Sequence, residues 1–320
     1  MPTSNTRTQD RVQVMTMFVA ISALSSAALV ACGGSGDSTT TSDTASSTST
    51  AGVLCDYSSS VFNSSPSVNA TATATWSCTS TLRSLTTNGL PDHAVGTFPN
   101  PGNPNTIAAR STSVSGTLTP TVTSAATAQS GPGVPMGYVL NGIKLDPGTA
   151  GTCDDSGTNC DPGRTVGAWN LEGIGGAFNF GTDASNAHVQ PDGTYHYHGI
   201  PEGFVTKLNK GQAMTLIGWA ADGFPIYARY GYGVATDAAS ALKVLKSSYR
   251  LKAVPDAKRP STALLPMGTF TQDYEYVAGL GDLDECNGRT GVTPEFPKGI
   301  YHYVATDTFP YLQRCVKGKL

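Results

Sequence analysis

The run GTYHYHGIPEG occupies residues 193–203, and a second run, GIYHYVATDTF, occupies residues 299–309. Each run places a histidine between two tyrosines shortly after a glycine. The chain has only five histidines, and three of them lie in these two runs. Because a strand alternates its side chains between two faces, His196 and His198 would share one face, about 7 Å apart, and the tyrosines the other. The two runs therefore predict a pair of related strands.

Two further runs repeat a second pattern ahead of these strands. Residues 137–146 read GYVLNGIKLD and residues 218–227 read GWAADGFPIY, each with Asn-Gly or Asp-Gly between apolar residues. Such a dipeptide is a strong hairpin signal, because both central residues of a type I′ turn need positive φ. The order hairpin, Tyr-His-Tyr, hairpin, Tyr-His-Tyr predicts two related halves, over residues 134–204 and 214–316. Chance recurrence of short turns is the alternative.

The composition favours β-structure. The chain has 36 glycines, 20 prolines and 13% charged residues, so turn signals are frequent and helix signals are few. Only residues 236–246 (TDAASALKVLK) look helical, with Thr236 or Asp237 as N-cap. We expect a mainly β, disulfide-stapled domain, sandwich-like or barrel-like, with two pseudo-repeated halves and few short helices. It would span residues 134–320 and follow an N-terminal β segment at 53–133.

Residues 1–31 are typical of a lipoprotein signal peptide. A short basic region precedes an uncharged stretch that ends in Leu-Val-Ala and then Cys32. The chain would be cut before Cys32, whose sulfur would carry the lipid, and residues 32–52 would form a Ser/Thr/Gly-rich tether to the membrane. An ordinary signal peptide and a membrane-anchor helix are the alternatives. Because Gly33 rather than aspartate follows, the protein of a Gram-negative cell would reach the outer membrane.

The remaining six cysteines predict three disulfides, since an even number in an exported chain is typical of a disulfide framework. Pairing between sequence neighbours is favoured among the fifteen possible connectivities. The expected pairs are Cys55–Cys78, Cys153–Cys160 and Cys286–Cys315. This pairing leaves no free thiol for a cysteine nucleophile or a thiolate metal ligand.

The charge of the chain excludes one class of partner. Removal of the signal peptide leaves 18 basic and 22 acidic residues, a net charge of −4. A nucleic-acid-binding protein needs a basic surface to neutralise phosphates. We therefore expect no nucleic-acid partner.

The histidine spacing predicts a metal site. His188 lies eight residues before His196, and a hairpin around Pro191-Asp192-Gly193 would bring it beside the Tyr-His-Tyr-His strand. His196, His198 and His188 would then gather in one place. If a pseudo-twofold axis pairs the halves, His302 would come near His196 as a fourth ligand. Neutral imidazole suits copper, zinc, iron or nickel, and we favour copper or zinc.

Neighbouring polar groups are candidates to orient these rings by hydrogen bonds. They are Tyr195, Tyr197, Asp192, Asp222, Asp284 and Glu285. His93, in the run LPDHAVG, is expected at the surface. No catalytic residue is identified.

A second, weaker metal candidate is the run CDDSGTNCD at residues 153–161. Its carboxylates and amide, at positions 154–161, are ligand types that Ca²⁺ takes, but their spacing does not match a calcium-binding loop. A short disulfide-closed polar loop is the favoured interpretation.

Four ordered runs resemble the YHYH domain family of exported proteins, over about residues 134–318. They are HVQPDGTYHYHGIP, IGWAADGFPIY, LDECNGRTG and YHYVATDTFPYLQRCVKG. The resemblance implies a shared domain without an established activity. It also implies that relatives often carry histidine at the positions of Arg289 and Val304, so that a fuller site is thinned here.

Three functions are consistent with these observations. The first is a cell-envelope lipoprotein that binds a transition metal through the histidines. The second is an adhesion or ligand-binding surface lipoprotein, in which histidines and tyrosines form a packed core seam. The third is a metal-dependent hydrolase or oxidase. Imidazoles that converge on one accessible point favour a metal, whereas imidazoles bonded to separate carbonyls favour packing.

Overall fold

The computed structural model describes residues 52–129 and 131–320. The predicted signal peptide and Cys32 lie outside these residues, as does all but the last residue of the predicted tether. The described residues all belong to one compact unit. Within the described ranges, no helix is both long enough and apolar enough to cross a membrane.

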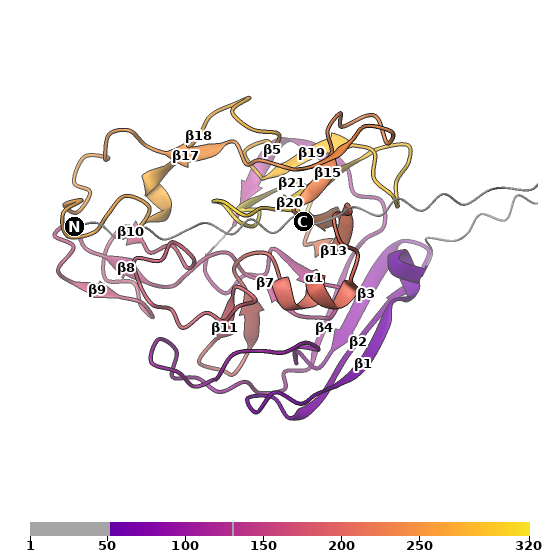
Figure 1. Cartoon of the computed structure of the whole chain (residues 1–320), viewed down its shortest axis with the longest axis horizontal. Coiled ribbons are helices and arrows are strands. Elements are labelled where there is room, and N and C mark those ends of the chain that lie inside the picture. The colour runs from indigo at the N-terminus through magenta and orange to yellow at the C-terminus, as the bar shows by residue number, and fades with distance from the viewer. Residues whose placement is uncertain (1–51, 130) are drawn as a thin grey trace, which may run out of the picture. The chain divides into compact units, whose positions relative to one another are not determined.

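The domain is mainly β, as predicted (Figure 1). Its centre is an open eight-stranded sheet of order β11-β12-β7-β6-β13-β14-β20-β19. Strands β13 and β14 are buried along their whole length, which explains their continuous apolar sequences TLIGWA and PIYA. The eight strands are β6 (Gly137–Val139), β7 (Lys144–Leu145), β11 (Ala187–Val189), β12 (Tyr195–Tyr197), β13 (Thr215–Ala220), β14 (Pro225–Ala228), β19 (Gly288–Gly291) and β20 (Ile300–Ala305).

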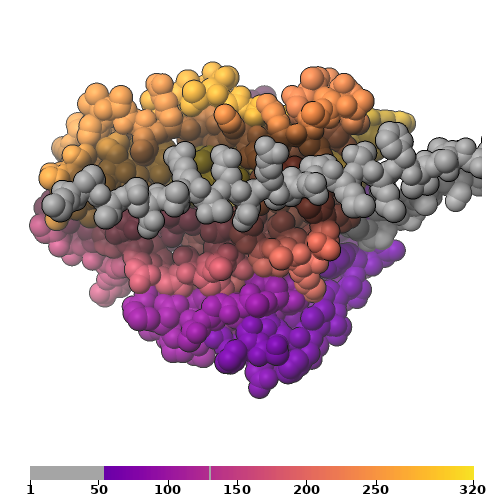
Figure 2. Space-filling model, in the orientation of Figure 1, coloured from indigo at the N-terminus to yellow at the C-terminus, as the bar shows by residue number. Residues whose placement is uncertain are grey.

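A second sheet, of order β1-β2-β3-β4, packs against this centre. Its strands are β1 (Ser58–Asn63), β2 (Ala70–Cys78), β3 (Leu82–Thr87) and β4 (Thr112–Thr117). The indole of Trp76 in β2 donates to the carbonyl oxygen of Leu140 at 2.9 Å. Figure 2 shows these indigo residues packed directly against the middle of the chain. The two sheets share one apolar core, which includes Trp76, Leu85, Val139 and Ile217.

Small sheets and helical turns complete the described domain. The sheets pair β5 (Val122–Ala128) with β21 (Cys315–Gly318), β15 (Tyr230–Tyr232) with β16 (Leu242–Val244), and β17 (Tyr249–Leu251) with β18 (Tyr274–Tyr276), and join β8 (Thr152–Cys153) to β9 (Cys160–Asp161) and β10 (Trp169–Asn170). The helical elements are α1 (Glu202–Leu208), a 3₁₀ turn (Thr271–Asp273) and a π turn (Gly52–Asp56). The three predicted disulfides are all present.

The predicted helix at residues 236–246 is wrong. The segment forms turns and then β16, which pairs with β15. Asp237 stabilises a turn rather than a helix, because its carboxylate accepts the backbone N–H of Ala239. All three side chains of β16 are exposed, so no apolar face is available to hold a helix against the core.

The two predicted halves are present as mirrored strand orders about the centre of the large sheet. In the first half β12 pairs antiparallel with β11 and parallel with β7, and in the second half β20 pairs antiparallel with β19 and parallel with β14. The halves meet where β6 and β13 pair antiparallel, with Tyr138 opposite Trp219. A pseudo-twofold axis therefore passes between these two residues.

The turns confirm this repetition but correct the predicted turn type. In the first hairpin the Gly142 N–H donates to Val139 and the Val139 N–H donates to Ile143, and Ala220, Gly223 and Phe224 repeat both bonds. Only the glycine has positive φ, +84° and +89°. The loops thus resemble three-residue hairpins with one left-handed glycine, not type I′ turns.

Glycine at the axis is required by close backbone approach. A Cβ on Gly218 would collide with the carbonyl of Tyr138 and lie 2.9 Å from the Cα of Val139. A Cβ on Gly137 would collide in the same way with Trp219 and Ala220. Both repeats therefore begin with glycine followed by an aromatic residue.

We predict that Gly218→Ala lowers the free energy of unfolding by about 2 kcal/mol or more, because the backbone of β6 must move away from β13. The matched control is Gly116→Ala in β4, where the nearest atom to a new Cβ is 4.0 Å away. That change should alter stability by less than about 1 kcal/mol. Guanidinium unfolding of both variants measures the difference, and equal effects would contradict the close approach at the axis.

Candidate functional site

Three histidines meet on one face of strands β11 and β12. His188 lies directly opposite His196 in the antiparallel register, and His198 follows two residues later on the same face. The turn between the strands repeats the hairpin pattern, because the Gly193 N–H donates to Gln190, and Gly193 has a φ of +92°. This is the hairpin predicted around Pro191-Asp192-Gly193.

The three imidazoles form a nearly equilateral triangle. Each pair of ring centroids is 4.7 Å apart. The Nε2 atoms of His188 and His198 are 3.0 Å apart, and one nitrogen of each of the three rings lies within 4.8 Å of the others. The three residues are the only group of His, Cys, Asp or Glu found in the described part of the chain that could hold a metal ion.

Backbone carbonyls orient two of these rings. The Nδ1 of His188 lies 2.8 Å from the carbonyl oxygen of Phe180, and that of His196 lies 3.3 Å from the carbonyl oxygen of Thr194. Each Nδ1 must therefore carry the proton, which leaves a lone pair on Nε2. The Nδ1 of His198 is buried and has no hydrogen-bond partner in the described residues.

The 3.0 Å contact allows two protonation states, because the Nε2–H of His198 can donate to the Nε2 of His188, or both rings can carry the proton on Nδ1. If His188 and His198 both carry the proton on Nδ1, two Nε2 lone pairs face each other at 3.0 Å and repel. A shared cation removes that repulsion. Two imidazoles on one tetrahedral zinc, with Zn–N bonds of about 2.0–2.1 Å, hold their nitrogens about 3.3 Å apart. Carbonyl partners at the second ring nitrogen are also typical of metal-ligating histidines.

Burial keeps the three rings neutral, as metal ligands must be. Desolvation lowers the pKa of His188, and it lowers the pKa values of His196 and His198 far below the ordinary histidine value. Repulsion among the rings lowers the latter two further. His196 and His198 are 2% and 1% exposed.

The cluster opens into a cavity of about 610 Å³, which all three histidines line. This volume lies within the range of small-molecule sites. The rest of the wall comes largely from glycines and prolines of several loops, with Phe180 as the aromatic contribution and Asp146 as a buried carboxylate. A small molecule in the cavity would contact the imidazoles directly.

Asp146 is a member of the site that the sequence analysis missed. Its carboxylate accepts hydrogen bonds from Lys144 at 3.3 Å and from Gln129 and Gln190 at 3.2 Å each. Desolvation raises its pKa above the ordinary value, and the lysine opposes this effect. The available signal was the alternation of polar Lys144, apolar Leu145 and polar Asp146, which puts the two polar side chains on one strand face. Lys144 lies opposite His196 across the parallel ladder.

The tyrosines face away from the histidines, and the predicted orienting role falls to backbone carbonyls instead. Tyr195 donates to Asp183 at 2.8 Å. The hydroxyl of Tyr197 accepts from the amide of Asn141 at 3.1 Å and lies 2.5 Å from Nε2 of His93. These bonds join the back of β12 to its neighbours.

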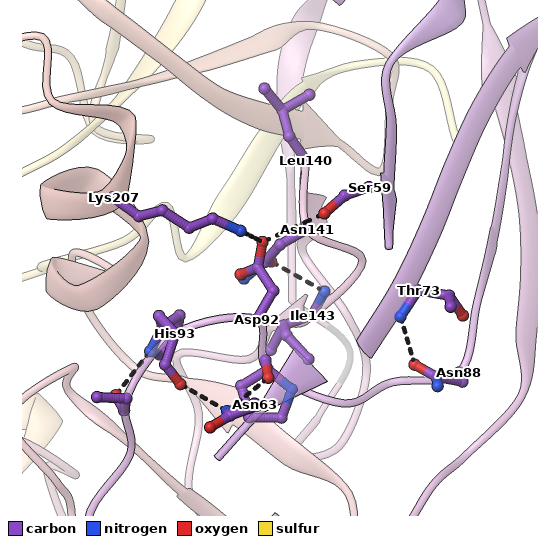
Figure 3. A network of polar contacts seen from close by, with 12 residues as sticks. Ser59, Asn63, Thr73, Asn88, Asp92, His93, Leu140, Asn141, Ile143 and Lys207 are labelled. Atoms are coloured by element: carbon purple, nitrogen blue, oxygen red, sulfur yellow. Dashed lines mark hydrogen bonds and ion pairs between the residues drawn. The ribbon is translucent and has the colours of Figure 1, made fainter. Parts of the chain in front are cut away.

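His93 is buried, so the prediction that it lies at the surface is wrong. It is 8% exposed and belongs to a polar network with Asn63 and Asp92 (Figure 3). Its Nε2 extends this network to the hydroxyl of Tyr197 on the back of β12. Beside it, Asp92 receives hydrogen bonds from Lys207 at 2.5 Å and from Asn141 at 2.9 Å. Asn63 donates to the carbonyl oxygens of Pro91 and His93. The network fixes the loop and strand β12 to each other.

The four carboxylates predicted to orient the rings form no hydrogen bond to the three histidines. Asp192 lines the cavity, but its carboxylate accepts the N–H of Thr194 within the turn. Asp222 bonds to Tyr303, Asp284 to Tyr301 and Glu285 to Lys317, all in the second half.

His302 lies far from the cluster, and the expectation that a twofold axis would bring it near His196 is wrong. The axis lies between β6 and β13, so β12 and β20 are five strand spacings apart in the sheet. This separation is about 24 Å. His302 is fully buried, and its Nε2 has no hydrogen-bond partner in the described residues.

The second half carries the same scaffold without the histidine cluster. In its register Arg289 lies opposite His302, where His188 lies opposite His196, and Val304 takes the place of His198. The Tyr227 ring packs edge-on against His302, with centroids 5.4 Å apart, at the position equivalent to Asp146. The second half therefore has arginine and valine where the first half has His188 and His198, and keeps one of the three histidines.

The candidate calcium loop uses its carboxylates locally. Asp154 accepts from the Ser156 hydroxyl and from the N–H groups of Ser156 and Gly157. Asp155 accepts the indole N–H of Trp169, and Asp161 accepts from Gly163 and Arg164. With the Cys153–Cys160 disulfide, this is the polar closed loop that the sequence favoured.

The family comparison confirms the resemblance. The family model described as "YHYH protein" matches residues 113–318, which is more than half of the chain. The match begins in β4 and ends in β21, so it includes both halves of the large sheet. No curated protein and no solved structure matches the chain.

We predict that His302 makes the metal-free protein less stable in acid. Burial lowers its pKa from 6.5 to about 4, so the unfolded chain takes up this proton first as the pH falls. Its contribution to stability is full above pH 6.5 and is lost between pH 6.5 and about 4, by about 3 kcal/mol.

Guanidinium unfolding with a chelator present, compared between the parent and His302→Gln, tests this effect. The variant should lose less stability than the parent between about pH 7.5 and about pH 4. Because the other histidines are common to both proteins, an identical pH dependence would exclude a buried neutral His302.

Proposed function

The chain belongs to the YHYH protein family, and we propose that it binds one transition-metal ion through the Nε2 atoms of His188, His196 and His198. The observation that carries the proposal is the 3.0 Å approach of two Nε2 atoms in a ring triangle where the Nδ1 atoms of His188 and His196 face backbone carbonyls. A packed core seam would instead give each imidazole its own separate partner.

Copper or zinc suits this donor set best. Three neutral imidazoles are the ligands that both ions take, and calcium or magnesium would need more oxygen ligands. The six cysteines of the described domain are paired in disulfides, so they offer no thiolate to shift the preference. Three protein ligands leave at least one coordination position for a further group.

The protein would act at the cell envelope. The basic region, the uncharged stretch and Cys32 support export and lipid anchoring, and the three disulfides are consistent with an oxidising compartment. In a Gram-negative cell the anchor would lie in the outer membrane. The role would then be metal handling at the membrane surface, with membrane lipid as the partner of Cys32.

The cavity supports a second role, in which the metal acts on a small molecule. A ligand that occupies the 610 Å³ space would contact the histidine triangle and lie within the walls that carry Asp146. A bound metal would supply Lewis-acid or redox chemistry there. Asp146 would be the nearby proton-accepting group, since Asp222 and Glu285 belong to the second half.

Metal content tests the proposal. The full chain, purified in detergent without a histidine tag and offered copper or zinc, should hold close to one equivalent. The double variant His196→Ala/His198→Ala should hold almost none, because His188 is the one ligand of the three that remains. His302→Gln is the matched control from the second half and should keep the metal.

The circular dichroism spectrum of each variant shows whether its fold survives. Loss of metal from the control to the same degree as from the double variant would contradict a site confined to the first half. A parent protein that binds neither ion would reject the proposal.

A further inference from the structure

A second cavity lies at the pseudo-twofold axis, on the seam between the two larger sheets. It has a volume of about 230 Å³. Tyr138 and Trp219, the residues paired across the axis, line it from the large sheet, and Trp76 and Arg83 line it from the four-stranded sheet. A neighbouring cavity of about 180 Å³ is also lined by Arg83 and Trp219.

Arg83 is a buried cation without a carboxylate partner in the described residues. It is 6% exposed, and its guanidinium carbon lies 3.3 Å from the ring centroid of Trp219. Its Nε donates to the carbonyl oxygen of Leu54 at 2.7 Å, but its terminal nitrogens make no hydrogen bond to the described chain. Desolvation alone lowers its pKa to about 10. A buried charge of this kind is costly without a counterion.

The other polar side chains that line the cavity differ in their hydrogen bonding, and the hydroxyl of Ser115 lies 2.8 Å from that of Ser84. The Nε1 of Trp219 is fully buried and has no hydrogen-bond partner in the described residues. The hydroxyl of Tyr138 makes no hydrogen bond there either, and burial raises its pKa. The Trp76 indole, by contrast, is satisfied by Leu140 and offers only its ring. The cavity therefore combines the unpaired guanidinium nitrogens of Arg83 with aromatic walls.

We propose that this cavity binds a small aromatic carboxylate, with the guanidinium of Arg83 as the donor to the carboxylate. The free guanidinium nitrogens match the two carboxylate oxygens. The rings of Trp76 and Tyr138 contact the aromatic body of the ligand. The site is distinct from the histidine cavity, with which it shares no lining residue.

Binding of phenylacetate to the full chain in detergent tests the proposal, with phenylacetamide as the neutral probe of the same shape. Isothermal titration with a chelator present excludes binding through a metal. The parent should bind phenylacetate at least about tenfold more tightly than phenylacetamide. Arg83→Met should remove that preference, because it deletes the charge and keeps an apolar side chain.

A second variant fills the cavity without touching Arg83. Gly116 lines the space, and the nearest atom to a new Cβ lies 4.0 Å away, so Gly116→Phe should occupy the cavity and abolish binding of both probes. The matched control is Ser113→Phe, at an exposed position of the same strand, and it should bind as the parent does.

Equal affinity of the parent for the two probes would overturn the proposal, because the charge of Arg83 would then make no contribution to binding. Unchanged phenylacetate binding in Gly116→Phe would place the ligand elsewhere and overturn it too. Absence of binding of either probe to the parent would leave Arg83 and Trp219 as a structural pair that closes the seam.

Discussion

The antiparallel contact between β6 and β13 is the constraint on which the rest of the domain depends. Gly137 and Gly218 let the two strands approach so closely that any side chain at either position would meet backbone atoms. The contact puts a pseudo-twofold axis at the centre of the eight-stranded sheet. The two Tyr-His-Tyr strands, β12 and β20, therefore lie near opposite edges of the sheet, and each has different neighbouring residues.

The two halves keep one scaffold and differ in chemistry. Tyr303 donates to Asp222 where Tyr197 accepts from Asn141, and Tyr301 donates to Asp284 where Tyr195 donates to Asp183. The tyrosine face is thus structural in both halves. The opposite face holds three histidines and a buried ion pair in the first half, but Arg289, Val304 and the ring of Tyr227 in the second.

The sequence contained most of the local information about this site. Strand parity and the Pro-Asp-Gly turn correctly placed His188 beside His196, and sequence proximity gave the disulfides. The position of the axis could not be predicted from the sequence, because two repeats can pair through any of their strands. The prediction that His302 lies near His196 was therefore wrong. The prediction that His93 is exposed was wrong because its burial depends on a contact with Tyr197, more than 100 positions later in the chain. The carbonyls of Phe180 and Thr194 that orient the rings belong to the backbone, so residue type does not predict them.

The most direct test of the histidine site is an anomalous difference map, recorded at the copper or zinc absorption edge from crystals of the metal-loaded protein. The account predicts one strong peak about 2.0–2.2 Å from the Nε2 atoms of His188, His196 and His198. It predicts none beside His302. A map without a peak in the first-half triangle, or with its peak in the second half, would contradict the account.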